Sequence, residues 1–334
     1  MTAPVLQVKD LKTKFFTDDG VVGAVDGVSF DLHPGETLGI VGESGCGKSV
    51  TALSILRLVQ EPGRITNGQI LFKGSDIVTM PDDDVRDIRG KDIAMIFQDP
   101  LSSLNPVLQV GYQIEEAMEA HQKVPGKTAL SRAIQLLKQV RIPAAESRVH
   151  DYPHQFSGGM RQRAMIAMGL ANKPSILIAD EPTTALDVTV QAQILELLRV
   201  LNQETKTAII LITHNMGVVA GLCTRVLVMY AGRVVEQGPV DQIFKDPQHP
   251  YTWSLLQSIP RLDADRKDRL LSIEGLPPDL IKPPPGCRFH PRCRFRVEKC
   301  FRDDPPLMDV GPDQDAACWV TMRRALGQNG EAIG

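Results

Sequence analysis

The feature that most restricts the fold is a glycine-rich stretch, GESGCGKSV, at residues 42–50. It matches the pattern G-x-x-x-x-G-K-[ST] through Gly42, Gly47, Lys48 and Ser49. The apolar run before it is typical of a strand and the run after it of a helix, which is the setting in which this motif holds phosphate groups. Glycines let backbone N–H groups turn toward phosphate oxygens, and the helix N-terminus adds partial positive charge. The stretch predicts a nucleoside triphosphate site, with Lys48 at the terminal phosphates and Ser49 on Mg²⁺.

Length and composition set broad bounds on the protein. The 334 residues, of which 43% are hydrophobic, suffice for one large domain plus an extension. The formal charge of −3 and the lack of a long Lys/Arg block argue against a nucleic-acid partner. No apolar run reaches the roughly 18–20 residues of a membrane span, and no signal segment is evident. We therefore expect a cytoplasmic protein whose six cysteines are thiols or metal ligands.

The order of predicted elements indicates an α/β fold with a mostly parallel sheet and flanking helices. Residues 5–16 and 21–36 alternate as antiparallel strands do, and 225–238 resemble a hairpin. Helical spacing dominates from about residue 100 to 170, which predicts a helical subdomain. Strands at 175–180 and 207–214 then flank a helix at 188–205, as in a parallel sheet. We expect a nucleotide-binding domain over 1–260 and a small Cys- and Pro-rich unit over 261–334.

An acidic pair follows the apolar strand SILIAD. Asp180 ends this run and Glu181 comes next. The carboxyl ends of parallel strands form the ligand-binding edge of such sheets. Asp180 suits the Mg²⁺ shell and Glu181 suits the positioning or deprotonation of an attacking water.

Together these motifs resemble the nucleotide-binding subunit of an ABC transporter. The segment FSGGMRQRAMIAMGLANKPSILIADEPTTALDVTVQAQ is similar to that family's signature helix, Walker B strand and D-loop, in their usual order. Gln98 in IFQDP matches the Q-loop and His214 in LITHN matches the switch histidine. The set spans most of residues 1–250, and its ordering is more specific than any single motif.

The resemblance implies a role for each matching residue. In this family ATP is held between one subunit's phosphate loop and its partner's signature motif, here Ser157, Gly158 and Gly159, with Phe156 and Met160 departing from the common LSGGQ. Glu181, His214 and Gln98 are the implied catalytic residues, and Ser49, Gln98 and Asp180 are the implied Mg²⁺ contacts. An aromatic adenine platform is expected at Phe15, unless Phe15 and Phe16 only fill the core. The implied ATP contacts are Phe15, Gly42, Ser44, Gly45, Cys46, Gly47, Lys48, Ser49, Val50, Ser157, Gly158, Gly159 and Asp187.

Three further segments resemble the ATPases of dipeptide and oligopeptide importers: FQDPLSSLNP, DPQHPYTWSLLQSIP and PPGCRFHPRCRF. The resemblance implies ATP hydrolysis that powers peptide uptake, at the cytoplasmic face of the inner membrane, as a peripheral subunit. It implies two transmembrane permease subunits, a second, paralogous ATPase and an external solute-binding protein as partners. A nickel or other small-solute importer is the alternative, and a soluble ABC ATPase acting on nucleic acid or ribosomes is a further one.

Four cysteines in the tail suggest a metal site: Cys287, Cys293, Cys300 and Cys318. The tail has no C-x-x-C pair, which weakens a zinc interpretation. Four thiolates equally suit an iron–sulfur cluster. Because relatives in the peptide-importer group carry a [4Fe–4S] cluster on a similar cysteine set, we expect a cluster rather than zinc, and four free thiols least. We expect the cluster to fold residues from about 286 to 319, so that loss of one ligand loosens the tail, and we expect the phosphate site to survive because its motifs lie in a separate domain.

Overall fold

The computed structural model describes residues 3–184, 186–258 and 273–325. These residues form two compact units, which we describe separately. The helical unit comprises the described residues of 3–6, 32–37 and 72–212. The loop unit comprises those of 7–31, 38–71 and 213–325. No helix within the described ranges is long and apolar enough to cross a membrane.

The loop unit begins with long strands. Strands β1 (Leu6–Thr17) and β2 (Gly20–Leu32) are joined by a two-residue turn and therefore run antiparallel, and β1 lies between β2 and β4 (Gly63–Phe72). Buried and exposed residues alternate along much of β1, as in a strand with one face on the core. This confirms the predicted antiparallel region at the N-terminus.

A second group of strands in the loop unit carries the phosphate loop. Strand β3 (Thr37–Val41) pairs in parallel with β9 (Arg225–Tyr230), and β10 (Arg233–Pro239) returns antiparallel to β9, which confirms the predicted hairpin. All five residues of β3 are buried, and helix α1 (Lys48–Ile55) begins seven residues after the strand ends. The phosphate loop thus joins a core strand to a helix, as predicted.

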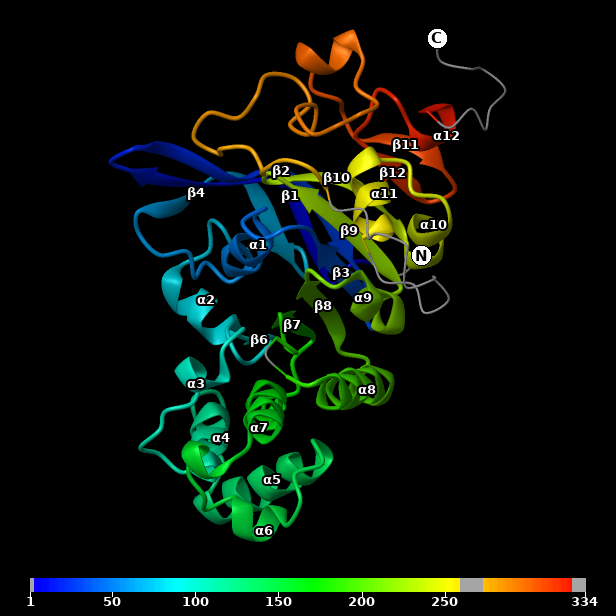
Figure 1. Ribbon diagram of the computed structural model, residues 1–334. Helices are drawn as coiled ribbons and strands as arrows, with labels where there is room; N and C mark the ends of the chain where they lie inside the picture. Colours follow the sequence, from blue (N-terminus) through cyan, green and yellow to red (C-terminus); the bar gives the residue numbers. More distant parts are fainter. Residues whose placement is uncertain (1–2, 185, 259–272, 326–334) are drawn as a thin grey trace. The chain divides into compact units, whose positions relative to one another are not determined.

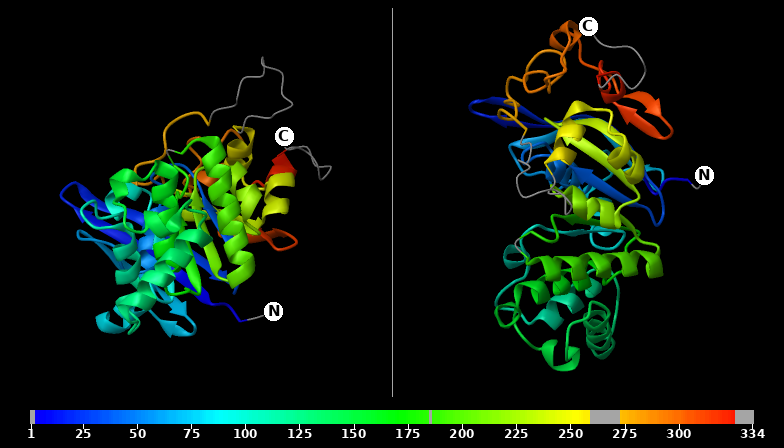
Figure 2. Two further views of the ribbon diagram at one scale, coloured as in Figure 1. Left: turned by 90° about the horizontal axis from the view of Figure 1, so that it is seen from below. Right: turned by 45° about the vertical axis from the view of Figure 1, so that its right-hand side comes forward.

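The described tail continues this group of strands. Strand β12 (Gln314–Ala316) pairs antiparallel with β10, and β11 (Met308–Gly311) pairs with β12 (Figure 2). The remaining helices of the loop unit are α9 (Met216–Leu222), α10 (Val240–Lys245), α11 (Pro250–Gln257), α12 (Met322–Ala325) and the 3₁₀ turn η2 (Glu298–Phe301). The tail therefore lies in the same compact unit as the phosphate loop.

The helical unit contains three parallel strands in the order β6 (Ile93–Ile96), β7 (Ile176–Asp180) and β8 (Ala208–Thr213). Strands β7 and β8 are buried at every residue, which explains their continuous apolar sequence, because both faces of such strands are covered. Helix α8 (Val188–Thr205) connects β7 to β8, as the sequence predicts. This confirms the parallel α/β core.

The predicted helical subdomain is also present. It consists of α3 (Pro100–Ser103), α4 (Val110–Glu119), α5 (Gly126–Gln139), α6 (Ala145–Arg148), the 3₁₀ turn η1 (Pro153–Gln155) and α7 (Gly158–Leu170). Helix α5 packs against both α4 and α7 (Figure 1), and buries Ala129, Ala133 and Leu137 at helical spacing. The short elements β5 (Ser75–Asp76) and α2 (Asp82–Ile88) precede β6.

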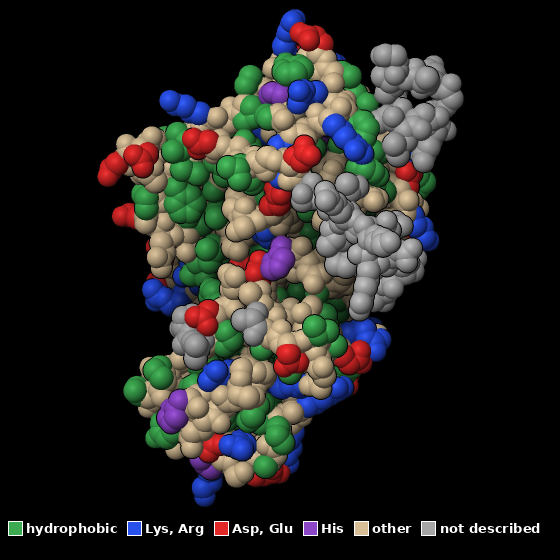
Figure 3. Space-filling model, in the orientation of Figure 1, with side chains coloured by type: hydrophobic (Ala, Val, Ile, Leu, Met, Phe, Trp, Pro, Cys, Tyr) green, Lys and Arg blue, Asp and Glu red, His purple; other side chains and the backbone are tan. Residues whose placement is uncertain are grey.

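The surface carries both signs of charge. On the face shown in Figure 3, acidic and basic side chains are interspersed rather than gathered into one basic area. This agrees with the small net charge of the chain.

Candidate functional site

At three positions the phosphate loop adopts a backbone conformation that only glycine tolerates well. Gly42, Gly45 and Gly47 have φ angles of 153°, 77° and 102°. A Cβ atom on Gly42 would lie 2.2 Å from the carbonyl oxygen of Met229, and one on Gly47 would lie 2.3 Å from that of Ala24. The sequence pattern is therefore explained by close backbone approach as well as by positive φ angles.

Lys48 is buried at the first position of α1, just behind the loop. Its Nζ donates hydrogen bonds to the carbonyl oxygens of Gly42, at 2.8 Å, and Glu43, at 3.0 Å. This places a cation inside the loop, where the helix N-terminus also favours negative charge. Burial raises the pKa of the neighbouring Cys46 thiol, so no thiolate opposes an anion there. The arrangement suits the binding of phosphate groups.

The acidic pair lies at the end of β7 in the helical unit. Asp180 is buried, and Glu181 follows with an unusual φ of 45°. The Glu181 carboxylate accepts hydrogen bonds from Gln98 Nε2, at 3.0 Å, and from Thr184 Oγ1, at 2.8 Å. Two predicted catalytic residues, Gln98 and Glu181, thus meet although 83 residues separate them. Thr184 was missed from the sequence, where only its place three residues after Glu181 could have indicated it.

The signature segment begins α7. Ser157 is the N-cap residue, and its hydroxyl accepts a hydrogen bond from the Met160 N–H at 3.3 Å. Gly158 and Gly159 then form the first positions of the helix, where backbone N–H groups have no partner within the helix. Phe156 is buried, so this departure from the common sequence keeps an apolar side chain in the core.

Three other predicted residues lie on loops or strands. The Asp187 carboxylate caps α8 by accepting a hydrogen bond from the Val190 N–H at 2.9 Å. His214 is exposed and follows β8 directly. Phe15 is half-buried and its ring lies against the backbone of Gly63.

The predicted ATP residues are divided between the two compact units. The loop unit holds the phosphate loop with Phe15 and His214, and the helical unit holds Gln98, the acidic pair, the signature segment and Asp187. Phe16 is 38% exposed and its ring carries the Arg64 guanidinium at 4.2 Å, so it does not fill the core.

The four tail cysteines line one small cavity in the loop unit together with aromatic side chains. The Cys318 thiol donates a hydrogen bond to the carbonyl oxygen of Val320 at 2.8 Å. The backbone of Phe289 and His290 favours the thiolate of Cys287, and that of Phe295 favours the thiolate of Cys293. Burial raises the pKa of Cys287, Cys293 and Cys318, that of Cys293 to about 11. The described conformation therefore holds these three as neutral thiols.

The donor types fit an iron–sulfur cluster, which takes four cysteine sulfurs and amide hydrogen bonds to them. Across the described ranges, however, no group of three or more His, Cys, Asp and Glu side chains is arranged to hold a metal ion. Tetrahedral zinc with Zn–S bonds of about 2.3 Å would need its sulfurs about 3.8 Å apart. The cysteines share a cavity but are not placed around one ion.

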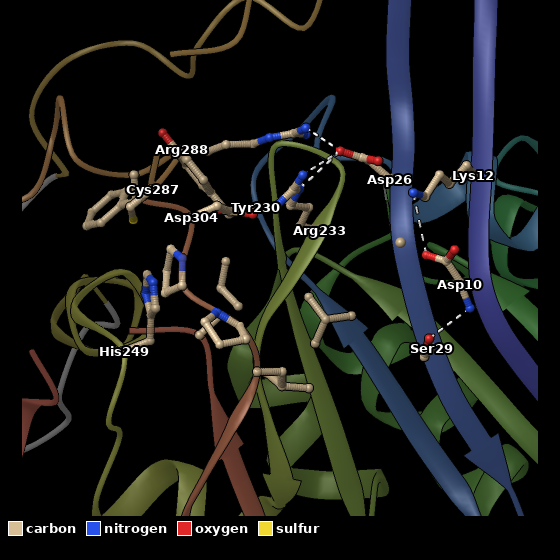
Figure 4. Close-up of a pocket in the computed structure, with 18 residues that line it drawn as sticks. Asp10, Lys12, Asp26, Ser29, Tyr230, Arg233, His249, Cys287, Arg288 and Asp304 are labelled. Carbon is tan, nitrogen blue, oxygen red and sulfur yellow. Dashed lines mark hydrogen bonds and ion pairs between the residues drawn. The ribbon is translucent and has the colours of Figure 1, made fainter. Parts of the chain in front are cut away.

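A larger cavity of about 340 Å³ lies beside the tail within the loop unit (Figure 4). Asp26 projects into it from β2 and accepts hydrogen bonds from Arg233 of β10 and Arg288 of the tail. Burial alone would raise the pKa of Asp26, but the two guanidinium groups outweigh this and lower it. These ion pairs join the tail to the N-terminal strands, which the sequence did not indicate.

Two family models match this chain, one over the phosphate loop and the acidic pair and one over part of the tail. The family "ABC transporter" matches residues 25–184, and "Oligopeptide/dipeptide transporter, C-terminal region" matches residues 235–300. The oligopeptide transport ATP-binding protein OppD of Bacillus subtilis is 51% identical over 95% of this chain and 88% of its own length. The dipeptide transport ATP-binding protein DppD of Lactococcus lactis is 50% identical over 96% of this chain and 92% of its own.

Among solved structures, a dimeric ATP-binding cassette with bound ADP and phosphate is similar, with a TM-score of 0.64 and 28% identity. The match covers 70% of this chain and 98% of that one. This confirms the fold class that the order of predicted elements indicated, and it confirms the resemblance to the ABC transporter family. With about half of all residues identical to these relatives over nearly the full length, the chain belongs to the family of oligopeptide/dipeptide ABC transporter ATP-binding proteins.

Proposed function

We propose that this chain is the ATP-hydrolysing subunit of an importer that carries dipeptides or oligopeptides into the cell. The observation that carries this proposal is a phosphate-binding loop, with Lys48 buried behind it, in one chain with a peptide-transporter C-terminal region. The names of the relatives favour peptide over nickel as the solute.

In the proposed mechanism, different residues bind the phosphates, activate the attacking water and hold Mg²⁺. Lys48 and the loop N–H groups bind the phosphates, and Glu181 orients a water and takes its proton as the water oxygen attacks the γ-phosphorus. The bond to the β–γ bridging oxygen breaks, and ADP and phosphate leave. Gln98 holds the Glu181 carboxylate at 3.0 Å, which supports this role for Glu181. Mg²⁺ would be held by Ser49, Asp180 and Gln98 and would supply neutralisation of phosphate charge.

The other predicted residues contact the γ-phosphate, the adenine or the second ATPase subunit in this proposal. His214 hydrogen-bonds the γ-phosphate, and Phe15 stacks on adenine from its half-buried place against Gly63. Ser157, Gly158, Gly159 and Asp187 act across the interface with a second ATPase subunit, where the N-terminus of α7 suits an anion.

We assign the assembled protein to the cytoplasmic face of the inner membrane as a peripheral subunit. Its partners are two permease subunits, a second, paralogous ATPase and an external solute-binding protein.

Affinity purification of the intact chain from native membranes, combined with uptake assays in a strain lacking it, tests this function. We expect permease subunits to co-purify and peptide uptake to be lost. Co-purification with ribosomes or DNA, or loss of nickel uptake with normal peptide uptake, would overturn the proposal.

For the tail we propose one [4Fe–4S] cluster held by Cys287, Cys293, Cys300 and Cys318. The shared cavity, and backbone groups that favour the thiolates of Cys287 and Cys293, support this. When bound, the cluster would hold a tail that has little apolar core of its own, because metal binding is coupled to the folding of such segments. Its ligands must be thiolates, so binding displaces their protons.

Analysis of anaerobically purified protein tests the cluster. We expect a brown protein that contains iron and acid-labile sulfide, and we expect Cys300→Ser to lose both. A colourless protein with one zinc per chain would reject the cluster but keep the ligands, and absence of metal in both aerobic and anaerobic preparations would reject both.

A further inference from the structure

The tail segment between Cys287 and Cys293 makes a direct contact with the phosphate loop. Arg292 donates two hydrogen bonds to the carboxylate of Glu43, from Nη1 to Oε2 at 2.6 Å and from Nη2 to Oε1 at 3.0 Å. This is the paired geometry that makes arginine–carboxylate contacts strong and specific. The Arg292 side chain is only 5% exposed and that of Glu43 is 25% exposed, so the guanidinium is shielded from solvent while the carboxylate is partly open to it, and screening by salt is reduced.

Glu43 is the second residue of the loop, and each of its polar groups is held by a different side chain. Its N–H donates to the Tyr251 hydroxyl at 2.9 Å, and its carbonyl oxygen accepts from Lys48 Nζ at 3.0 Å. Its carboxylate is bound by Arg292. Glu43 therefore connects Lys48, which is expected to bind the phosphates, to the side chains of Tyr251 and Arg292.

Aromatic packing fixes the two distant side chains. Tyr251 of α11 is fully buried, and its ring lies 4.7 Å from that of Tyr230 and 5.4 Å from that of Phe289. Arg292 also donates to the Tyr230 hydroxyl at 3.4 Å and to the Glu274 carbonyl oxygen at 3.0 Å. These hydrogen bonds fix the position of the Arg292 guanidinium next to Glu43.

The charge of Glu43 explains why such a contact matters for the loop. A carboxylate beside a phosphate cradle repels the ligand, and this repulsion is strong where the surroundings exclude water. The Arg292 guanidinium cancels that charge. It also fixes the backbone of Glu43, whose carbonyl oxygen helps to place Lys48.

We propose that Arg292 is a positioning residue for the phosphate loop: it neutralises and anchors Glu43, so that the cysteine-bearing tail sets the affinity of the loop for Mg-ATP. This inference rests on the proposed function of the loop. From the sequence we expected the phosphate site to survive loosening of the tail; the Arg292–Glu43 contact shows that the two segments touch.

Four variants of the full chain test the proposal: Arg292→Met, Arg292→Lys, Glu43→Gln and the double variant Glu43→Gln/Arg292→Met. The dissociation constant for a fluorescent N-methylanthraniloyl ATP with Mg²⁺ is measured for each, with KM and kcat in the assembled transporter and the melting temperature. Arg302→Met is the matched control, because Arg302 is in the same tail but forms an exposed ion pair with Glu298.

We expect Arg292→Met to raise the dissociation constant and KM about tenfold, and kcat to change less than KM, because an uncompensated charge in the loop opposes ligand binding. The dissociation constant of Arg292→Lys should lie between those of the unchanged protein and Arg292→Met, because lysine keeps the charge but not the paired geometry. Removing the Glu43 charge as well should recover most of the affinity. Arg302→Met should bind normally.

Two results would overturn the proposal. One is normal ATP affinity in Arg292→Met and Arg292→Lys. The other is a double variant that binds no better than Arg292→Met, which would mean that the arginine supports only folding. The variant Lys48→Ala distinguishes failure of the inference about Arg292 from failure of the proposed ATP site. If that variant binds ATP normally, the loop is not the ATP site; if it binds poorly while the arginine variants bind normally, only the present inference fails.

Discussion

Glu181 combines a strained backbone with two hydrogen bonds to its side chain. Its φ of 45° is uncommon for a residue with a Cβ atom, and such conformations persist where the surroundings enforce them. Here the Glu181 N–H donates to the Ile212 carbonyl oxygen at 2.9 Å, and Gln98 and Thr184 hold the carboxylate. The orientation of the carboxylate is thus fixed by Gln98, which precedes β7 in the sequence, and by Thr184, which follows it.

Replacing Glu181 with Gln should separate ATP binding from hydrolysis. The amide keeps the size of the side chain but cannot take a proton from water, so we expect turnover by the assembled transporter to fall about 100-fold or more. Affinity for Mg-ATP should change by less than about threefold. Steady-state phosphate release and nucleotide titration measure the two effects. Glu196→Gln, which removes an exposed carboxylate paired with Arg199 on α8, is the control, and near-normal turnover by Glu181→Gln would refute the assignment.

At the scale of elements, α7 packs tightly against α8 at Gly159. A Cβ atom built there would lie 2.7 Å from Cγ1 of Val190, whereas one on Gly158 would meet Leu186 Cδ2 at an ordinary 3.7 Å. Val190 is β-branched and cannot easily turn away. The second glycine of the signature segment is therefore required by packing, independently of any role with ATP.

Gly159→Ala should lower the free energy of unfolding by about 1–3 kcal/mol, because the added methyl group overpacks the contact with Val190. Gly158→Ala should be close to neutral, since it meets ordinary contacts and gains helix propensity. Urea unfolding of both variants measures the difference. The double variant Gly159→Ala/Val190→Ala should recover part of the loss; equal stabilities for the two alanine variants would contradict this packing.

His249 gives α11 a pH-dependent cap. Its Nδ1 accepts a hydrogen bond from the Tyr251 N–H at 3.0 Å, and burial lowers its pKa from 6.5 to about 3. Below about pH 6.5 the unfolded chain binds a proton that the folded chain excludes. The stability from this group is therefore present above pH 6.5 and is lost as the pH falls toward 3, by about 1.4 kcal/mol per unit.

The variant His249→Asn should remove this pH dependence while retaining a cap, because asparagine also accepts hydrogen bonds at helix N-termini. Between about pH 7.5 and about pH 5.5 the unchanged protein should lose about 1.4 kcal/mol more of its unfolding free energy than the variant. Urea titrations at the two pH values provide the comparison. Equal losses would show that His249 is not held neutral in the folded protein.

For the whole molecule, the isolated chain should hydrolyse ATP slowly. The family resemblance implies that each ATP site needs a signature segment from a second subunit, so a single chain lacks part of every site. We expect the rate per chain to rise with protein concentration or on addition of the permeases and the second ATPase that we propose as partners. Phosphate release measured over a dilution series tests this, and a fast rate that does not change on dilution would contradict a shared site.

The sequence predicted the elements correctly where a few adjacent residues determine the local backbone. The strand and helix that flank the phosphate loop and the acidic pair at the end of β7 each depend on local backbone geometry, which residue order encodes. The contact of Arg292 with Glu43 could not be predicted, because no pattern links residues 249 positions apart. Strands β11 and β12 were also missed, since MDVG and QDA are too short to show alternation.

The distances along the chain between Glu43 and its partners bear on how the protein is made. Tyr251 follows Glu43 by 208 residues and Arg292 follows it by 249. A ribosome adds residues at about 5–20 per second from the N-terminus, so the loop emerges many seconds before either partner exists. During synthesis the nascent chain carries a phosphate loop whose glutamate is still unpaired. On the proposed role of Arg292, only a nearly finished polypeptide acquires its full nucleotide affinity, and fragments released early from the ribosome would compete poorly for ATP.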